Sequence, residues 1–350
     1  MTTIREIAKR LNLSITTVSR ALDGYDDVSE ATRLRVQQAA AQLGYIPNQA
    51  ARQLRRGRTD TLGYILPAAG GEDFSPTRRR GFADPFSAEF IAGLGDETAA
   101  RGLSLLVSSA VPDSSAEQAA YRAWAQAHKV DGFLLNRVRL HDWRMRFLAD
   151  GRIPFVSLEN SLDGLDAPRV EVDNRAGMAE LAAHLAAQGW RCPAYLGGPP
   201  ELRLQFERLE GLRAGLKQVG LPFDPALAIH IPLTSQDGYA GARSLLSAHP
   251  QIDALVCIND EVAFGALHAA RDLGRQPGRD LAVTGFDGVQ EAAHAQPALT
   301  TLDQPVYQIA RSMVRLLLDA LYPPAEAAGQ VISLRPVLLA RASSLRETPA

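Results

Sequence analysis

Charged and amide side chains follow several apolar runs of this sequence, at points where strands are predicted to end. Asn259 and Asp260 follow the run 254–258, and Asp287 follows the run 281–286. Further such residues are Asn136, Arg137, Glu159, Asn160 and, near the start of a helical run, Arg208. Because ligands in open α/β sheets bind beyond the carboxyl ends of the strands, we expect these side chains to converge on one cleft. Carboxylates, amides and a guanidinium can together bond the several vicinal hydroxyls of a sugar.

Each of these residues has a plainer explanation when it is taken alone. A polar side chain after a strand can cap the next helix or form a surface turn, so the binding hypothesis rests on the whole set. Phe86 is a candidate for an aromatic wall of the same cleft. The preceding segment 68–84 is rich in Gly, Pro and Arg, and we interpret it as a solvated loop, with a lid formed by the arginines 78–80 as the alternative.

The sequence lacks the motifs of common enzymes. It has no His-Glu-x-x-His pair, no Gly-x-x-x-x-Gly-Lys-Ser/Thr phosphate loop and no Gly-x-Ser-x-Gly elbow, and its seven histidines are scattered. Cys192 and Cys257 are too few for a disulfide scaffold or a cysteine metal site. We therefore predict no catalysis, no metal and no cofactor. The enzyme alternative, a sugar-modifying enzyme such as a kinase fused to a separate N-terminal head, needs an Asp-x-Gly-x-Thr-like run that is absent.

Length and charge indicate a chain of two or three domains with a cationic head. The 350 residues are 46% hydrophobic and 22% charged, which is ordinary for a globular protein. The apolar runs are too short for a membrane span, and charges at 5, 6, 9 and 10 exclude an N-terminal signal sequence, so we expect a cytoplasmic protein. Residues 1–60 carry ten Arg or Lys and six Asp or Glu, a net charge of +4 against −6 for the remainder. This asymmetry predicts that the head alone binds a polyanion.

The head has the pattern of a helix-turn-helix followed by a third helix. Thr3 and Glu6 can form a capping box before an amphipathic run that ends at the turn residues 12–13. Ser14 is placed to cap a second helix, and Ser29 a third that stops at Gly44. An ordinary helical hairpin is the alternative, since amphipathic pairs are common.

The second helix is predicted to enter the major groove of DNA. Ile15 and Thr16 open it, and side chains of the first turn of a recognition helix reach base edges. Arg20 is a candidate for two-pronged contact with guanine, with a phosphate contact as the alternative. Thr17, Ser19 and Arg20 are expected on its outer faces together with Ile15 and Thr16.

A short helix is expected after the head. Pro47 forbids continuation of the third helix, Asn48 can cap a new one, and Gly57 ends it after about two turns. A helix of that length is marginal in water, so we expect it to be disordered in the free protein and to fold against a partner.

Residues 3–59 resemble the DNA-binding headpiece of the lactose-repressor (LacI/GalR) family. The resemblance rests on Thr17-Val-Ser-Arg-Ala-Leu22, Val28-Ser-Glu-Ala-Thr32 and Leu43-Gly-Tyr-Ile-Pro-Asn48, and continues to about residue 343. It implies a homodimer reading a near-palindromic operator, with Leu54 of the hinge helix wedged into the minor groove. It also implies contacts of the DNA backbone with Ser14, Thr17, Ser19, Ser29, Thr32, Tyr45 and Asn48. Asp23 departs from the asparagine often found at that position.

From Thr61 the sequence alternates between strand-like and helical runs, which predicts parallel sheets covered on both faces. The predicted strands are 62–66, 103–108, 132–136, 155–158, 194–196, 227–231, 254–258, 281–286 and 331–339. The predicted helices are 88–101, 116–128, 175–188, 207–219, 238–247, 261–273 and 306–321. By resemblance this is a two-lobed, periplasmic-binding-protein-like (type I) α/β sensor attached to an all-α helix-turn-helix headpiece. The resemblance places effector contacts on Arg208, Asn259 and Asp287, and more loosely on Glu159.

The resemblance also suggests where the domains divide. The head spans 1–47, and the hinge helix with its linker spans 48–60. Lobe 1 is expected at about 61–170 and 305–330, lobe 2 at about 171–304 and 331–343, and a tail at 344–350, too short for a tetramer-forming coiled coil.

The sequence indicates the identity of the effector less clearly than the fold. The run Arg137-Val-Arg139 followed by Asp142, together with Ile15-Thr-Thr-Val18, resembles family members that answer to maltose or other α-glucosides. A purine co-repressor, which strengthens DNA binding, is the alternative. The sequence therefore predicts a transcriptional regulator, a repressor of carbohydrate-utilisation genes that a sugar releases from DNA.

Overall fold

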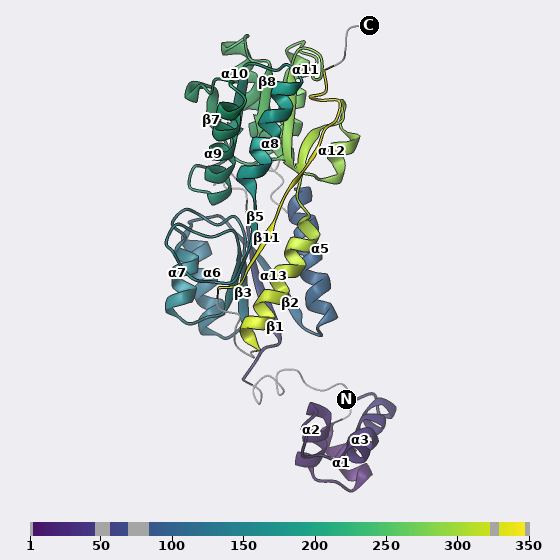
Figure 1. Cartoon of the computed structure of the whole chain (residues 1–350). Helices are drawn as coiled ribbons and strands as arrows, with labels where there is room; N and C mark the ends of the chain where they lie inside the picture. Colours follow the sequence, from purple (N-terminus) through teal and green to yellow (C-terminus); the bar gives the residue numbers. More distant parts are fainter. Residues whose placement is uncertain (1–2, 46–56, 69–83, 323–328, 347–350) are drawn as a thin grey trace. The chain divides into compact units, whose positions relative to one another are not determined.

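The computed structural model describes residues 3–45, 57–68, 84–322 and 329–346. The chain divides into two units, Met1–Asp60 and Thr61–Ala350, each of which folds around its own core (Figure 1). Asn48, Leu54 and the expected hinge helix lie outside the described residues, as does most of the segment 68–84. Among the described residues, no helix is both long and apolar enough to cross a bilayer.

The first unit is a bundle of three helices, α1 (Ile4–Leu11), α2 (Ile15–Asp23) and α3 (Glu30–Gln42). The predicted caps of α2 and α3 are confirmed, since the Ser14 hydroxyl accepts from the Thr17 amide at 2.9 Å and the Ser29 hydroxyl from the Thr32 amide at 3.3 Å. The predicted capping box at Thr3 is wrong. The Thr3 side chain makes no capping bond, and the Glu6 amide instead donates to the Thr3 carbonyl at 3.1 Å.

The second unit contains two six-stranded sheets, one in each lobe. The first sheet has the order β11-β5-β4-β3-β1-β2, all parallel, with strands β1 (Thr61–Pro67), β2 (Ser104–Ala110), β3 (Gly132–Leu135), β4 (Phe155–Leu158), β5 (Arg169–Val172) and β11 (Val331–Leu334). The second has the order β12-β10-β9-β8-β6-β7, with strands β6 (Pro193–Gly197), β7 (Ala228–His230), β8 (Ala254–Cys257), β9 (Ala282–Asp287), β10 (Thr300–Asp303) and β12 (Val337–Leu339). Only β12 runs antiparallel to its neighbour among these paired strands.

Helices cover both faces of each sheet (Figure 1). Those of lobe 1 are α5 (Pro85–Ala100), α6 (Ser115–Gln126), α7 (Trp143–Asp150) and α13 (Val306–Leu321). Those of lobe 2 are α8 (Asn174–Ala187), α9 (Arg203–Gln218), α10 (Ser235–Ala248), α11 (Asp260–Asp272) and α12 (Gln290–His294), with a 3-10 turn at Pro225–Leu227. The pairs α5 and α13, α8 and α9, and α10 and α11 pack closely. This arrangement confirms the predicted α/β architecture.

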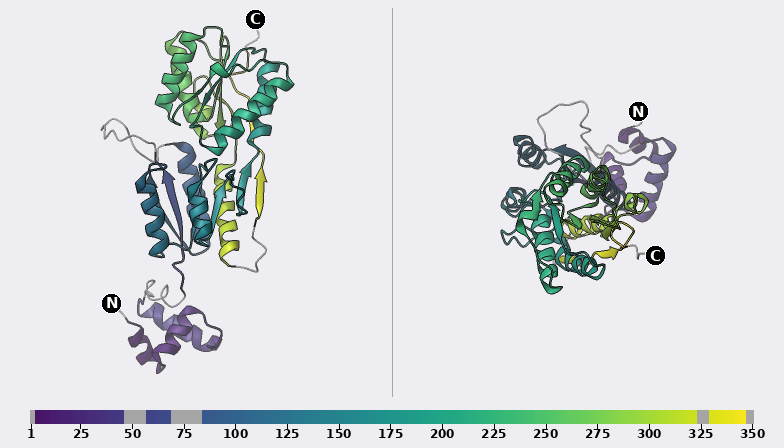
Figure 2. Two further views of the ribbon diagram at one scale, coloured as in Figure 1. Left: turned by 90° about the vertical axis from the view of Figure 1, so that its left-hand side faces the viewer. Right: turned by 90° about the horizontal axis from the view of Figure 1, so that it is seen from above.

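The chain crosses between the lobes three times, after β5, after β10 and between β11 and β12. Figure 2 shows these connections at the junction of the lobes, where the Asp173 amide donates to the Leu334 carbonyl at 2.8 Å. The strand predicted from 331 to 339 was expected in lobe 2 alone, and this is wrong. Pro336 lacks an amide donor, so the ladder breaks and β11 joins the first sheet while β12 joins the second.

The predicted start of the tail, at 344, is also too early. The side chains of Ser343 and Ser344 are fully buried, and the Ser343 hydroxyl donates to the Val283 carbonyl at 2.6 Å. The Trp190 indole donates to the Ser344 carbonyl at 2.8 Å. Residues up to at least 344 therefore belong to lobe 2.

A backbone clasp, formed by residues 138–140 of lobe 1 and 201–203 of lobe 2, joins the lobes directly. The Leu140 amide donates to the Glu201 carbonyl at 2.7 Å, and the Arg203 amide donates to the Val138 carbonyl at 2.8 Å. These bonds flank an antiparallel bridge between Arg139 and Leu202. The clasp holds the two lobes together at one side of the cleft.

Candidate functional site

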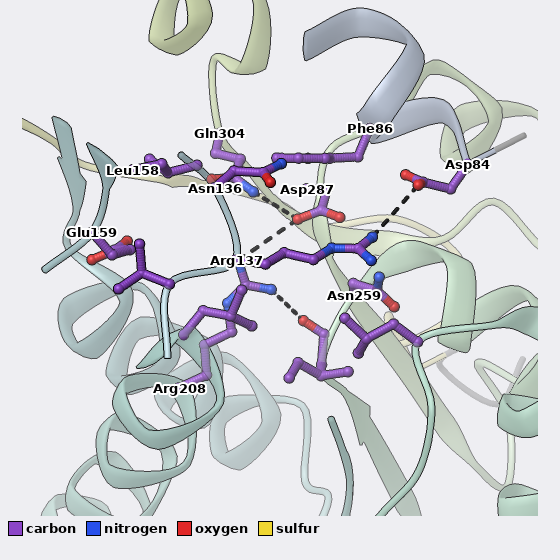
Figure 3. Close-up of a pocket in the computed structure, with 14 residues that line it drawn as sticks. Asp84, Phe86, Asn136, Arg137, Leu158, Glu159, Arg208, Asn259, Asp287 and Gln304 are labelled. Carbon is purple, nitrogen blue, oxygen red and sulfur yellow. Dashed lines mark hydrogen bonds and ion pairs between the residues drawn. The ribbon is translucent and has the colours of Figure 1, made fainter. Parts of the chain in front are cut away.

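A pocket of about 590 Å³, measured to its open mouth, lies between the two lobes of the second unit. The residues expected to converge here line it, namely Phe86, Asn136, Arg137, Glu159, Arg208, Asn259 and Asp287, except that Asn160 and Asp260 do not; seven lining residues were not named for that role. The lining residues are Asp84, Phe86, Asn136, Arg137, Val138, Leu158, Glu159, Leu204, Arg208, Leu233, Ile258, Asn259, Asp287 and Gln304 (Figure 3). The position after a strand therefore predicts most of the pocket residues correctly, and their role in binding stays a prediction.

Arg208 is the central cation of the pocket. It projects from α9, is only 4% exposed, and its Nε donates to the Asn174 Oδ1 at 2.9 Å. Its Nη1 donates to the Ile258 carbonyl, its Nη2 lies 3.7 Å from the Asp287 Oδ1, and its Cζ lies 3.5 Å from the centroid of the Phe286 ring. Burial lowers the pKa of the guanidinium, and the charge of Asp287 opposes that change. These contacts fix the guanidinium plane before any ligand is present.

Two buried carboxylates face this cation. Glu159 Oε1 accepts from the Val172 amide at 3.2 Å and from the Asn174 Nδ2 at 2.9 Å, and burial raises its pKa to about 7. Asp287 Oδ1 accepts from the Gln304 Nε2 at 2.6 Å, and burial raises its pKa to about 7 as well. Near neutral pH each group can therefore accept a hydrogen bond or, when protonated, donate one.

The backbone at both carboxylates is held in the left-handed region, with φ of 73° at Glu159 and 119° at Asp287. Asp260 holds the loop that carries Asp287. Its Oδ2 accepts from the amides of Gly288 and Val289 at 2.9 and 3.0 Å, and its Oδ1 from the Thr301 hydroxyl at 2.6 Å. Asp260 is thus a structural support of the pocket and does not line it.

Asn259 combines capping with a place in the pocket. Its Oδ1 accepts from the Val262 amide at 3.0 Å and caps α11, which confirms the plainer explanation for this residue. The amide nitrogen remains as a donor for a ligand, because Asn259 also lines the pocket (Figure 3). Capping and ligand contact are therefore compatible at this position.

Further residues of lobe 1 complete the pocket. The Arg137 Nη2 lies 3.5 Å from the Asp84 Oδ2, and Asp84 also caps α5 by accepting from the Ser87 amide at 2.9 Å. Asn136 is 1% exposed, and neither atom of its amide group bonds to any described residue. A buried amide without partners is costly, so this side chain is suited to a ligand that supplies both a donor and an acceptor.

Asp84 and Gln304 line the pocket although no binding role was predicted for them. Asp84 stands in the run that contains Phe86, but it reads first as a helix cap. Gln304 follows β10. No strand was predicted there, so Gln304 was not recognised as a polar residue at the carboxyl end of a strand. The apolar residues Leu204 and Leu233 carry no pattern that separates them from core residues.

Arg139 and Asp142, which contributed to the resemblance with maltose-responsive regulators, do not line the pocket. The Arg139 Nη2 donates to both oxygens of Glu117, at 3.2 and 3.0 Å. Arg144 donates to Asp142 and to the carbonyls of Asn136 and Arg137, at 3.2 and 3.1 Å. This buried ion cluster therefore supports the loop that carries Arg137 and offers no ligand contact of its own.

The candidate DNA-reading surface is the outer face of α2 in the first unit. Ile15 is 47% exposed, although it is apolar, and Thr16 and Arg20 are exposed beside it. The Ser14 and Thr17 hydroxyls bond each other at 2.8 Å, as do those of Ser29 and Thr32 at 2.9 Å. Tyr45 is half-buried.

Ser19 departs from the prediction. It is only 9% exposed and its hydroxyl lies 3.4 Å from the Asp23 Oδ2, so the expected exposure on the outer face is wrong. The reason is geometric, because Ser19 follows the core residue Val18 and lies partly on the inner side of α2.

Comparison with known proteins places this architecture in a family. The model of the bacterial regulatory proteins, lacI family, matches residues 3–48, and that of a periplasmic binding protein-like domain matches residues 182–344. The HTH-type transcriptional regulator CelR of Thermobifida fusca is 32% identical over 320 residues, 91% of this chain and 91% of CelR. The chain belongs to the LacI family. It is therefore a transcriptional regulator, and the prediction that it is not an enzyme is confirmed.

Two further relatives extend the comparison of this LacI-family regulator. The HTH-type transcriptional repressor CytR of Escherichia coli (strain K12) is 30% identical over 317 residues, 91% of this chain and 89% of CytR. The solved structure of a transcriptional regulator CelR–cellobiose complex is 30% identical, with a TM-score of 0.72, covering 98% of this chain and all of that one. The two-lobed fold predicted from the sequence is thus confirmed.

Proposed function

We propose that this LacI-family regulator is a homodimeric, cytoplasmic repressor that a sugar releases from a near-palindromic DNA operator. The inter-lobe pocket carries the proposal, because three carboxylates, two guanidiniums and three amides converge there. Vicinal hydroxyls satisfy such a set of donors and acceptors better than an apolar ligand does. The similarity to a regulator whose structure was solved with cellobiose supports a sugar as the effector. The similarity to a transcriptional repressor supports repression as the action on transcription.

On the DNA side, we propose that Ile15, Thr16 and Arg20 read base edges in the major groove. Ser14, Thr17, Ser29, Thr32, Tyr45 and Asn48 contact the backbone in this proposal, and Ser19 contributes least because it is buried. Leu54 wedges into the minor groove, where a partner chain supplies the second wedge. The exposed apolar side chain of Ile15 supports the base-reading role, because thymine methyl groups offer it an apolar surface.

The pocket and the DNA-binding head are coupled in this proposal through lobe closure. An effector that binds the closed lobes more tightly than the open ones shifts the population toward the closed form. Couplings of this kind are typically about 1–3 kcal/mol, or about 5- to 150-fold in affinity. The effector side chains, Phe86, Arg137, Glu159, Arg208, Asn259 and Asp287, come from both lobes, so one ligand contacts both.

Maltose and other α-glucosides remain the narrower hypothesis for the effector. A thermal-shift screen with maltose, cellobiose, monosaccharides, nucleosides and purine bases tests it directly. A shift with a sugar, absent in an Asp287→Ala variant, is the expected result. An increase in melting temperature with purines alone, accompanied by tighter DNA binding, would show that the effector is a co-repressor and not an inducer.

A further inference from the structure

An acidic residue holds the arginine of the recognition helix. The Arg20 Nε donates to the Asp27 Oδ1 at 3.1 Å, and the Arg20 Nη2 lies 2.5 Å from the Asp27 Oδ2. The two side chains are 44% and 52% exposed, so water competes with the pair. An exposed ion pair adds little to stability. The pair therefore contributes little to holding the fold together, and its two-point geometry orients the guanidinium.

The pair occupies only one edge of the guanidinium. An arginine has five N–H donors in a rigid plane, and Asp27 takes those on the Nε–Nη2 edge. Nη1 makes no hydrogen bond with the described residues of the head, and together with the second N–H of Nη2 it forms the other edge. This free edge has the donor spacing that guanine O6 and N7 accept in the major groove.

Asp27 is itself held in place by the turn between α2 and α3. The Val28 amide donates to the Tyr25 carbonyl at 3.3 Å, and the Val28 side chain is buried in the core of the head. The Arg33 Nη2 donates to the Tyr25 carbonyl at 2.9 Å and ties this turn to α3. The Tyr25 ring lies 5.0 Å from the Arg20 Cζ and adds a second restraint on the guanidinium.

We propose that Asp27 is a positioning residue for base recognition, which clamps one edge of Arg20 so that the other edge faces guanine. The inference rests on the proposed function of α2 as the DNA-reading helix. It goes beyond that function by assigning a role in base specificity to Asp27, a residue outside the recognition helix. A free arginine side chain samples many rotamers and also reaches phosphates, whereas a clamped one presents a fixed fork.

The charge of Asp27 gives the proposal a distinctive consequence. A carboxylate near DNA repels phosphates, so its removal raises affinity for every sequence if charge is its only effect. A clamp predicts the additional loss of preference for one base. Affinity and specificity therefore move in opposite directions in an Asp27→Ala variant.

The neighbouring residue provides a matched control. Asp26 is exposed, stands one position earlier in the same turn, and makes no hydrogen bond or ion pair with the described residues. Asp26→Ala and Asp27→Ala remove the same charge from nearly the same place. The two variants should share one salt dependence of DNA binding and differ only in base preference.

The experiment uses the full-length protein. Wild type first selects from a library of duplexes randomised over about 20 base pairs, enough for two half-sites about one helical turn apart. The enriched duplex, and versions with each guanine replaced in turn, are then titrated by fluorescence anisotropy with wild type, Asp26→Ala, Asp27→Ala and Arg20→Ala. Circular dichroism checks that all four heads are folded.

In Asp27→Ala, the preference for one guanine in each half-site over the other bases is expected to fall about tenfold. Arg20→Ala is expected to lose its preference for the same guanine. Asp26→Ala is expected to keep that preference. If Asp27→Ala discriminates as well as Asp26→Ala while Arg20→Ala does not, the clamp is refuted and the base-reading role of Arg20 stands. If wild type enriches no sequence, both the clamp and the proposed function are refuted.

Discussion

Replacing Arg203 with proline tests whether the backbone clasp controls lobe closure. The Arg203 amide donates across the cleft to the Val138 carbonyl at 2.8 Å, and proline has no amide proton. Arg203 is the first residue of α9, where proline is well tolerated. The preceding Leu202 has φ −76° and ψ 132°, a conformation that a residue before proline adopts readily.

The size of the effect follows from the single bond that is lost. A neutral hydrogen bond contributes about 0.5–1.5 kcal/mol, so loss of about 1 kcal/mol shifts the balance between closed and open lobes by roughly fivefold. Amide hydrogen exchange at Leu140, the other donor of the clasp, reports this opening without any ligand. We expect Leu140 to exchange about fivefold faster in Arg203→Pro than in wild type.

The matched control is Arg203→Ala. It keeps the amide donor but, like the proline variant, loses the ion pair with Glu207 and the contact with the Phe206 ring, whose centroid lies 5.7 Å from the Arg203 Cζ. Leu140 exchange in Arg203→Ala should match that of wild type. Equal exchange in the alanine and proline variants would show that the clasp bond does not hold the lobes, and the reasoning would fail.

Three other predictions follow from the pocket. Asp287→Ala should bind operator DNA like wild type but fail to release it with the sugar, and normal release in a gel-shift titration would remove Asp287 from effector binding. Glu159 and Asp287 have pKa values raised to about 7, so the folded state retains protons that the unfolded chain loses from about pH 4. Their contribution to the free energy of unfolding should therefore fall as pH rises from about 4 to 7 and level off above pH 7. In urea titrations, the free energy of unfolding of Glu159→Gln should fall less steeply over this pH range than that of wild type. An equally steep fall in both proteins would contradict the prediction. Asp260→Ala removes the acceptors of two amides, one of them buried, and of one hydroxyl, and should lower the free energy of unfolding by about 3 kcal/mol, against about 1 kcal/mol for Thr301→Val. Similar urea midpoints for these two variants would contradict the supporting role given to Asp260.

The parts of the fold that were predictable have strong periodicity. Eight apolar strands and seven amphipathic helices were located from the sequence, because burial on one face or both leaves a clear pattern. Strand β5, Arg-Val-Glu-Val, was missed because two of its four residues are charged. Helix α7 was missed because its buried Arg144 reads as a surface residue, while in the structure Asp142 neutralises it.

The pocket was predictable in outline for a topological reason. Parallel strands bring their carboxyl ends to one edge, so residues far apart in sequence, such as Glu159 and Asp287, could be grouped without knowing their distances. The partners of each side chain were not predictable. Whether Asp260 points into the pocket or beneath a loop depends on the conformation of residues 287–289, and Arg139 pairs with Glu117 across 22 positions of sequence.

In the proposed mechanism, a ligand in the inter-lobe pocket changes the affinity of the head for DNA. The most direct measurement is the dissociation constant of the enriched duplex, determined by fluorescence anisotropy with and without a saturating concentration of the sugar found in the thermal-shift screen. We predict that the sugar raises this constant at least about fivefold for wild type, and leaves it unchanged for Asp287→Ala. A sugar that binds wild type yet leaves the constant unchanged would contradict the account.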